Sequence, residues 1–281
     1  MTNSPPKPSK ALAHGTRGAV ARLLDSAQAR GRLVVSVDEL AAACNLSAIA
    51  VKRQIAHLAD RVVRLPGRPA CYLIVPPEHR ERGAPPIDQW LGAYFRLRGE
   101  PYYLGLLSAA AMHGSSQQAV LVTQVMTSRP MRSIELGRVR IEGHVKAGVG
   151  TTPLTELRGL VSPLAVSSPE ATSLDLVVFN ASVGGIARAA QVIAGLLPVM
   201  SSAGMKKALA VETTITVKQR LGYILETVGA PKLAKVVAAS LPERTARILL
   251  QPWAVNTKDR PVTVSPWNVT DNIDLSKELS S

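Results

Sequence analysis

The stretch DELAAACNLSAIAVKRQIAHL, residues 38–58, decides the fold of the first part of this 281-residue chain. Its second half carries apolar side chains at the i, i+4, i+7 spacing of one helix face. Those side chains are Val51, Ile55 and Leu58. The pattern predicts a helix from about Ala48 to Asp60 whose remaining side chains point away from the core.

The residues before this helix predict where it starts. Asn45 tolerates left-handed backbone angles, so a tight turn is expected there. Ser47 follows at the position where a side-chain oxygen can cap the next helix. Upstream, Ser36 or Asp38 can cap a shorter helix that runs through Ala43. The sequence therefore predicts two short helices joined by a tight turn.

Two β-prone runs follow the second of these helices, at residues 62–65 and 71–75. A Pro-Gly turn separates them, so a hairpin is predicted. Arg68 stands at its tip and Arg64 lies just before the turn. The hairpin therefore presents basic side chains that suit a phosphate strand.

With a helix expected over 16–29 and a short strand at 33–35, the element order is helix, strand, helix, turn, helix and basic hairpin. This order resembles a winged helix-turn-helix. That fold places its second turn-linked helix in the major groove of DNA. Winged helices also serve as protein–protein modules, which is the alternative for this domain.

The exposed face of the helix predicted over 48–60 carries several polar side chains. Arg can bind guanine and Gln can bind adenine through paired hydrogen bonds, whereas other basic groups more often contact phosphates. The residues expected to bind DNA are Ser47, Lys52, Arg53, Gln54, His57, Arg64 and Arg68. Among them Arg53 is the strongest candidate for a base contact.

The chain is strongly basic, with 33 Lys and Arg against 20 Asp and Glu and a net charge of +13. Residues 1–82 hold 13 of these basic residues and six of the acidic ones, so basic density is concentrated at the front. Such an excess favours a polyanionic partner, either nucleic acid or an anionic membrane surface. Aromatic residues make up only 4%, which argues against a surface that stacks many unpaired bases.

Composition divides the chain into regions. The segment PPEHRERGAPP at 76–86 is charged, flanked by prolines and poor in apolar residues, which suits a linker. We therefore expect a disordered arm over 1–14, the winged domain over 15–78, a linker over 79–87 and a second domain over 88–281.

The second domain is expected to be a larger α/β domain with a mostly antiparallel sheet and several helices, which makes the whole chain α+β. A helix that ends at Gly114 is predicted by an apolar stripe consisting of Leu104, Leu107, Ala111 and Met112. Alternating residues between 120 and 142 predict strands with one solvent-facing side. A capped helix is expected from about Ser168, and mainly helices from 184 to 241.

The sequence shows no catalytic or metal-binding constellation. Cys44 and Cys71 form no CxxC motif and are expected to be small buried side chains. Residues 148–152 hold G-x-G without a third glycine, and Glu142 lacks the spacing of a nuclease core. No signal region or membrane-spanning stretch is present, so a cytoplasmic protein without cofactor or metal is expected.

Three segments of the second domain together resemble a known family. They read PYYLGLLSAAAMHG (101–114), SSPEATSLDL (167–176) and QRLGYILE (219–226), with a β-rich stretch between the first two. The combination resembles the AbiEi antitoxins, bacterial regulators paired with a nucleotidyltransferase toxin, over about 16–270. The resemblance implies a winged-helix domain that binds inverted repeats in the promoter of its own operon. It also implies a C-terminal domain that opposes the toxin without a stable complex.

The expected function is therefore a DNA-binding repressor and antitoxin with no catalytic activity. Its expected partners are double-stranded promoter DNA with inverted repeats, bound by two copies on adjacent half-sites, and a cognate toxin. A second basic group could add phosphate contacts, although a solvated strand face explains it more simply: Arg129, Arg132, Arg138 and Arg140. The alternatives are an effector-sensing regulator whose C-terminal domain binds a metabolite, a nuclease tethered to a DNA-binding domain, and a protein adaptor.

Overall fold

The computed structural model describes residues 18–115, 121–156, 164–253, 263–264 and 266–280. Contacts divide the chain into two compact units. The first comprises the described part of 1–100 together with 132–140, and the second comprises the described part of the remainder. The arm expected over 1–14 lies outside the described residues, and the domain boundaries inferred from the sequence remain a prediction.

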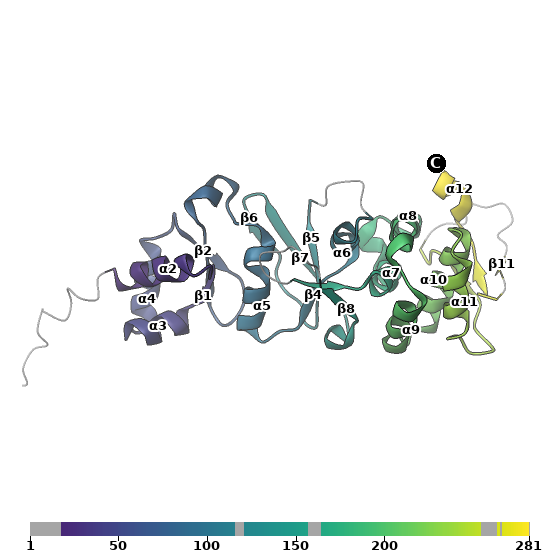
Figure 1. The fold of residues 1–281 in the computed structure, drawn as a ribbon, viewed down its shortest axis with the longest axis horizontal. Coiled ribbons are helices and arrows are strands. Elements are labelled where there is room, and N and C mark those ends of the chain that lie inside the picture. The colour runs from purple at the N-terminus through teal and green to yellow at the C-terminus, as the bar shows by residue number, and fades with distance from the viewer. Residues whose placement is uncertain (1–17, 116–120, 157–163, 254–262, 265, 281) are drawn as a thin grey trace, which may run out of the picture. The chain divides into compact units, whose positions relative to one another are not determined.

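The first unit contains the expected series of helices and strands (Figure 1). The elements are α2 (Ala19–Ala29), β1 (Val34–Ser36), α3 (Val37–Cys44), α4 (Ala48–Ala56), β2 (Val62–Leu65) and β3 (Cys71–Ile74). The three strands form an antiparallel sheet in the order β1-β3-β2, in which Leu65 lies opposite Cys71. Helices α2, α3 and α4 pack on one another through buried residues such as Leu24, Leu40 and Val51.

Side-chain caps fix the ends of these short helices. The Ser36 hydroxyl accepts a hydrogen bond from the Glu39 amide at 3.0 Å and so starts α3. Asn45 ends α3 in the left-handed region, with φ of 52°. Helix α4 ends at Ala56 and not at Asp60 as predicted, because the next two amides bond to carbonyls three residues back in a tighter turn.

The first unit continues beyond the hairpin. The segment expected to be a linker contains the 3-10 helix η1 (Pro77–Arg82), and η2 (Ile87–Gln89) leads into helix α5 (Leu91–Arg98). Helix α5 packs against β1. The strand β6 (Ile134–Leu136) also belongs to this unit, and the Arg138 amide beside it donates to the Arg82 carbonyl at 3.1 Å.

The second unit is built on a mixed sheet. Its strands are β4 (Tyr102–Leu104), β5 (Thr123–Thr127), β7 (Val139–Val145, whose first two residues group with the first unit), β8 (Leu154–Glu156) and β9 (Ala165–Ser167). The sheet order is β6-β7-β5-β4-β9-β8, with β5 parallel to β7 and β4 parallel to β9. The pairs β4–β5 and β8–β9 are antiparallel, so the expectation of a mostly antiparallel sheet is met in part, and the two parallel pairs make the sheet mixed. Alternation of apolar residues is the same in parallel and antiparallel strands, so it does not encode direction.

The motif PYYLGLLSAAAMHG forms a strand and then a helix. Leu104 belongs to β4, where it pairs with Val125, and α6 (Leu106–Met112) begins after Gly105. The prediction of Leu104 as part of a helical stripe is therefore wrong. Gly105 packs closely against the Met126 side chain, where a Cβ would lie 2.6 Å away.

Helices form the rest of the second unit. They are α7 (Pro169–Val178), α8 (Ile186–Leu196), α9 (Ser202–Val211), α10 (Ile215–Thr227), α11 (Pro231–Ala238) and α12 (Leu275–Ser280), with the short 3-10 helices η3 (Val149–Thr151), η4 (Asn180–Val183) and η5 (Leu197–Val199). A small sheet has the order β10 (Ile248–Leu249), β12 (Val269–Thr270), β11 (Thr263–Val264).

Helix α7 is the centre of the second unit. It contacts α6, α8, α9 and α10, which surround it in Figure 1. Every residue from Pro169 to Val177 is buried. Ser168 caps it as predicted, accepting from the Ala171 amide at 3.2 Å. Two acidic side chains, Glu170 and Asp175, are thereby carried into the core. Within the described residues, no helix has the length and apolarity that crossing a membrane requires.

Candidate functional site

Helix α4 presents one polar face and one apolar face, as its sequence predicts. Ser47 caps the helix by accepting from the Ala50 amide at 3.2 Å, and its hydroxyl hydrogen stays available to an external acceptor. Val51 and Ile55 are buried. The side chains that point outward from α4 and the residue after it are Lys52, Arg53, Ala56 and His57, all exposed.

The cations of α4 and the hairpin differ from other arginines of the unit in how they are paired. Among the described residues Lys52, Arg53, Arg64 and Arg68 form no ion pair, and all four side chains are exposed. Other arginines of the same unit are paired, as Arg32 is with Glu39, Arg61 with Asp25 and Arg80 with Asp60. The unit therefore leaves the positive charge of α4 and the hairpin available to an external partner.

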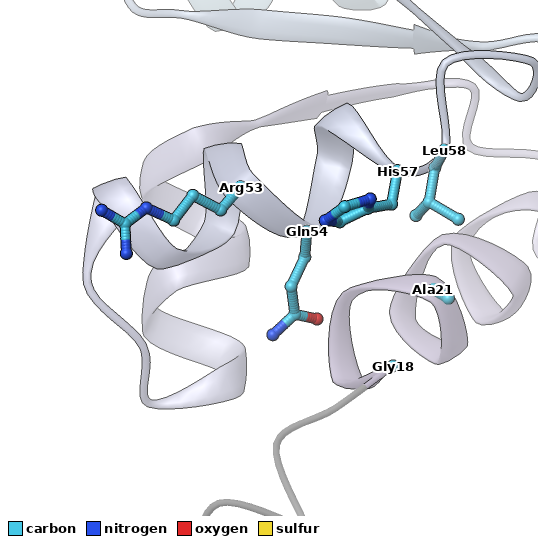
Figure 2. Close-up of a pocket in the computed structure, with 6 residues that line it drawn as sticks. All are labelled: Gly18, Ala21, Arg53, Gln54, His57 and Leu58. Carbon is cyan, nitrogen blue, oxygen red and sulfur yellow. The ribbon is translucent and has the colours of Figure 1, made fainter.

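Gln54 is oriented differently from its neighbours on α4. Its Oε1 accepts from the Val20 amide at 3.3 Å, which ties α4 to the first turn of α2. Figure 2 shows this side chain pointing toward the start of α2 near Gly18, whereas Arg53 points away from α2. A shallow hollow of about 380 Å³ lies between the two helices, bordered by Arg53, Gln54 and His57.

The hairpin loop is held in place by helix α5. The Tyr94 hydroxyl donates to the Pro66 carbonyl at 2.9 Å, and Arg98 Nη1 donates to the same oxygen at 3.2 Å. Burial raises the pKa of Tyr94 to about 12, so its phenol remains a donor at neutral pH. Gly67 lies directly under the Arg98 guanidinium, where a Cβ would overlap it. These contacts fix the base of the loop that carries Arg68.

Sequence reasoning did not single out Tyr94 and Arg98. Both lie in an ordinary helix some 30 residues from the loop, and no local pattern reports such a contact. Arg98 also forms a two-pronged ion pair with Glu100, with both nitrogen–oxygen distances 2.9 Å. Its role is to position the loop.

The second group of arginines suggested by the sequence is partly neutralised. Arg140 pairs with Glu135 at 3.7 Å between their side chains. Arg129, Arg132 and Arg138 are exposed. A solvated strand face accounts for these side chains as well as a phosphate contact does.

The second unit contains a buried polar cluster that joins two of its sequence motifs. Asp175 of α7 has no exposed surface and accepts from Lys146 Nζ at 2.6 Å and from the Tyr103 hydroxyl at 2.8 Å. The Thr152 hydroxyl lies 3.5 Å from that of Tyr103. Tyr103 belongs to PYYLGLLSAAAMHG and Asp175 to SSPEATSLDL, so the two motifs meet at this carboxylate.

Burial dominates the electrostatics of this cluster. It raises the pKa of Asp175, while the adjacent Lys146 ammonium opposes that change. Burial and the Asp175 carboxylate likewise raise the pKa of Tyr103, which stays protonated and donates. A cavity of about 20 Å³ beside the cluster has room for about one water molecule. The arrangement cross-links β4, α7 and the segment that follows β7.

The remaining candidates for chemistry also have structural partners. His113 lies at the end of α6, where its Nε2 is 2.7 Å from the Ser167 carbonyl. Cys71 is buried and Cys44 is half-buried, and burial raises the pKa of both thiols. No group of three His, Cys, Asp or Glu side chains in the described part of the chain is arranged to hold a metal ion.

One comparison with known proteins matches part of the second unit, and another matches the fold of nearly the whole chain. Residues 103–227 match the family model described as the AbiEi antitoxin C-terminal domain. The crystal structure of the RV2827C protein from Mycobacterium tuberculosis is similar in fold, with a TM-score of 0.65 and 17% sequence identity over 93% of each chain. No curated protein matches the sequence.

Proposed function

We propose, from the match of residues 103–227 to the AbiEi antitoxin C-terminal domain, that this chain is the antitoxin of a toxin–antitoxin pair and a DNA-binding repressor of its own operon. Its first unit is proposed to be a winged helix-turn-helix, with α3 and α4 as the turn-linked helices and β2–β3 as the wing. The proposed DNA target is a duplex with inverted repeats, bound by two copies on adjacent half-sites.

One observation carries the DNA-binding proposal. The exposed cations of α4 and the hairpin have no carboxylate partner among the described residues, whereas Arg32, Arg61 and Arg80 do. An unpaired exposed cation gains most from a phosphate, because binding releases condensed counterions and breaks no internal ion pair. The slim start of α4, with Ala48 and Ala50, suits insertion into a major groove.

The seven proposed DNA-binding residues are expected to contact different parts of the DNA. Arg53 is proposed to bind a base edge, because a guanidinium matches the two acceptors of guanine. Lys52, Arg64 and Arg68 are proposed to bind phosphates, as is the Ser47 hydroxyl. His57 is proposed as a neutral groove contact. The Gln54 Oε1 already accepts from the Val20 amide, so a paired contact to adenine through both amide atoms would compete with the link between α4 and α2.

A binding titration tests this half of the proposal. The full chain is titrated onto the duplex upstream of its own gene and onto a shuffled duplex of equal length, at stated salt. We expect the upstream duplex to bind at least 10³-fold more tightly than the shuffled one, the low end of specific recognition. Equal affinity for both duplexes would show that the first unit does not recognise a sequence.

The second unit is proposed to oppose a nucleotidyltransferase toxin without forming a stable complex. The first test is whether the adjacent reading frame encodes a nucleotidyltransferase, and the second is co-expression of the chain with that protein. We expect growth to be restored by the full chain and by a Lys52→Ala, Arg53→Ala variant that is defective in DNA binding. Failure of the full chain to restore growth would refute the antitoxin role.

The alternative, a regulator whose C-terminal domain binds a metabolite, has little support from the second unit. The polar cavity beside Lys146 has room for about one water molecule. The apolar groove between α9 and α11 has few polar groups to orient a ligand.

A further inference from the structure

A second hollow lies in the first unit, at the end of α2 that is remote from α4. It has a volume of about 610 Å³ and is formed by the C-terminal end of α2, strand β1 and helix α5. This volume is typical of sites that hold small molecules. Its polar lining side chains are Gln28, Arg30, Arg32, Glu78, Gln89 and Arg96.

The hollow is rich in positive charge. Three arginines and a single acidic residue, Glu78, are among the residues that line it. Arg32 is already paired with Glu39 at 2.5 Å. Arg30, which caps the end of α2, and Arg96, in the last turn of α5, form no ion pair within the described residues. Two separate helices therefore bring two unneutralised cations to one concave surface.

The hollow is also lined by neutral residues, which offer hydrogen-bonding amides and apolar surface. The Gln28 and Gln89 side chains make no hydrogen bond to any described residue, so both amides can donate and accept. Leu33 and Ala93 supply an apolar wall. The planar donors of arginine match the oxygens of a phosphate group, and a pair of arginines on two elements matches a chain of phosphates.

We propose that this hollow binds a small polyphosphate of nucleotide size, such as a nucleoside triphosphate. The phosphate chain lies between Arg30 and Arg96. The two amides and the apolar wall accept the neutral part of the molecule. This site is distinct from the DNA-binding face, because an 11-residue helix spans about 16 Å and the hollow lies at its far end from Gly18.

The position of the hollow also suggests a regulatory consequence, which rests on the proposed DNA-binding function. Helix α2 is tied to α4 at its first turn by the Gln54–Val20 hydrogen bond. A ligand that joins the other end of α2 to α5 acts on two elements at once, because α5 also holds the hairpin loop through Tyr94 and Arg98. Occupancy of the hollow is therefore expected to change the affinity for duplex DNA.

Isothermal titration calorimetry on the full chain tests the site without relying on DNA. The probes are ATP, inorganic pyrophosphate and adenosine. We expect ATP and pyrophosphate to bind and adenosine not to bind. A preference for ATP over pyrophosphate shows that the neutral wall takes part, and equal affinity shows that the phosphate chain is sufficient. Both results support the proposal.

Variants separate the site from general positive charge. The Arg30→Gln, Arg96→Gln variant is expected to weaken ATP and pyrophosphate binding at least tenfold, with unchanged thermal unfolding. Arg82→Gln removes an exposed arginine of the same unit outside the hollow and is expected to change binding less than twofold. Binding of ATP and pyrophosphate by the Arg30→Gln, Arg96→Gln variant and by Arg82→Gln is compared at equal ionic strength.

Several outcomes would overturn the proposal. These are no heat with ATP or pyrophosphate at millimolar concentration, and an equal loss of binding in Arg82→Gln. A third is weaker duplex binding by the double variant in the absence of any ATP binding, which would assign these arginines to DNA phosphates. If the unaltered chain binds ATP but no duplex, the proposed function fails while the proposed site stands.

Discussion

Two places in the molecule, one in each compact unit, use basic side chains in opposite ways. On α4 and the hairpin of the first unit, Arg53 and Arg68 are exposed and have no carboxylate partner among the described residues. In the second unit, Lys146 donates at 2.6 Å to Asp175, a carboxylate with no exposed surface. The first arrangement keeps charge available to a polyanion, and the second neutralises charge inside the fold. The absence of an ion-pair partner for an exposed cation therefore identifies a binding surface better than net charge does.

Removing the buried cation is expected to have the largest effect. In Lys146→Ala the Asp175 carboxylate loses its counter-charge while it stays buried, so the free energy of unfolding should fall by about 3 kcal/mol. Urea denaturation measures this change. Lys206→Ala, at an exposed lysine of α9, is the matched control and should change stability by less than about 0.5 kcal/mol. A loss below about 1 kcal/mol in Lys146→Ala would mean that the pair contributes little to holding the second unit together.

Removing an exposed cation should instead affect binding. We expect Arg53→Ala to weaken binding to the upstream duplex by about 1–3 kcal/mol and to leave unfolding unchanged. Lys52→Ala is the comparison, because loss of a phosphate contact should weaken matched and shuffled duplexes alike. Fluorescence anisotropy at fixed salt measures both variants. Unchanged affinity of Arg53→Ala for the upstream duplex would exclude Arg53 as a base contact.

The support of the hairpin loop can be tested at a single hydroxyl. Tyr94→Phe removes the donor to the Pro66 carbonyl, which should lower the free energy of unfolding by about 1 kcal/mol. Because Arg98 still holds the same carbonyl, the loop should stay folded and duplex affinity should fall only slightly. Tyr72→Phe, on the neighbouring strand β3, serves as the control. Equal stability of the two variants would show that α5 does not position the loop through Tyr94.

The smallest expected effect is a pH dependence in the second unit. Burial lowers the pKa of His144, whose Nε2 has no hydrogen-bond partner among the described residues and whose ring packs against Phe179. Glu142 opposes this shift weakly. The unfolded chain therefore binds the proton more tightly, so the contribution of His144 is complete above the unfolded pKa of about 6.5 and declines as the pH falls below it.

Thermal unfolding at pH 7.5 and pH 5.5 measures this dependence. The midpoint should be lower at pH 5.5, and the difference between the two pH values should be smaller in His144→Gln, which cannot take up a proton. An identical difference in both proteins would show that other groups cause the pH dependence.

The sequence predicts the elements of the first unit well, because their ends are encoded locally. Ser36, Asn45 and Ser47 each cap or end a helix through a neighbour at most four residues away. The exposed face of α4 follows from the spacing of Val51 and Ile55 in the same way. Periodicity and capping are short-range properties, which is why they can be inferred from one chain.

The features that the sequence does not predict depend on distant contacts. Alternation gives no strand direction, so the parallel pairing of β5 with β7 was not foreseen. The carboxylate of Asp175 meets Tyr103 from 72 residues away, and Tyr94 reaches Pro66 from 28 residues away. Such contacts are set by topology, and no pattern in either local segment predicts them.

The central claim is that the first unit binds duplex DNA through the unpaired cations of α4 and the hairpin. The most direct test is the salt dependence of binding to the upstream duplex, measured by anisotropy from 50 to 300 mM KCl. The three cations proposed to bind phosphates, Lys52, Arg64 and Arg68, predict a slope of about −3 in a plot of log affinity against log salt. Absence of binding at 50 mM KCl, or a slope near zero, would contradict the claim.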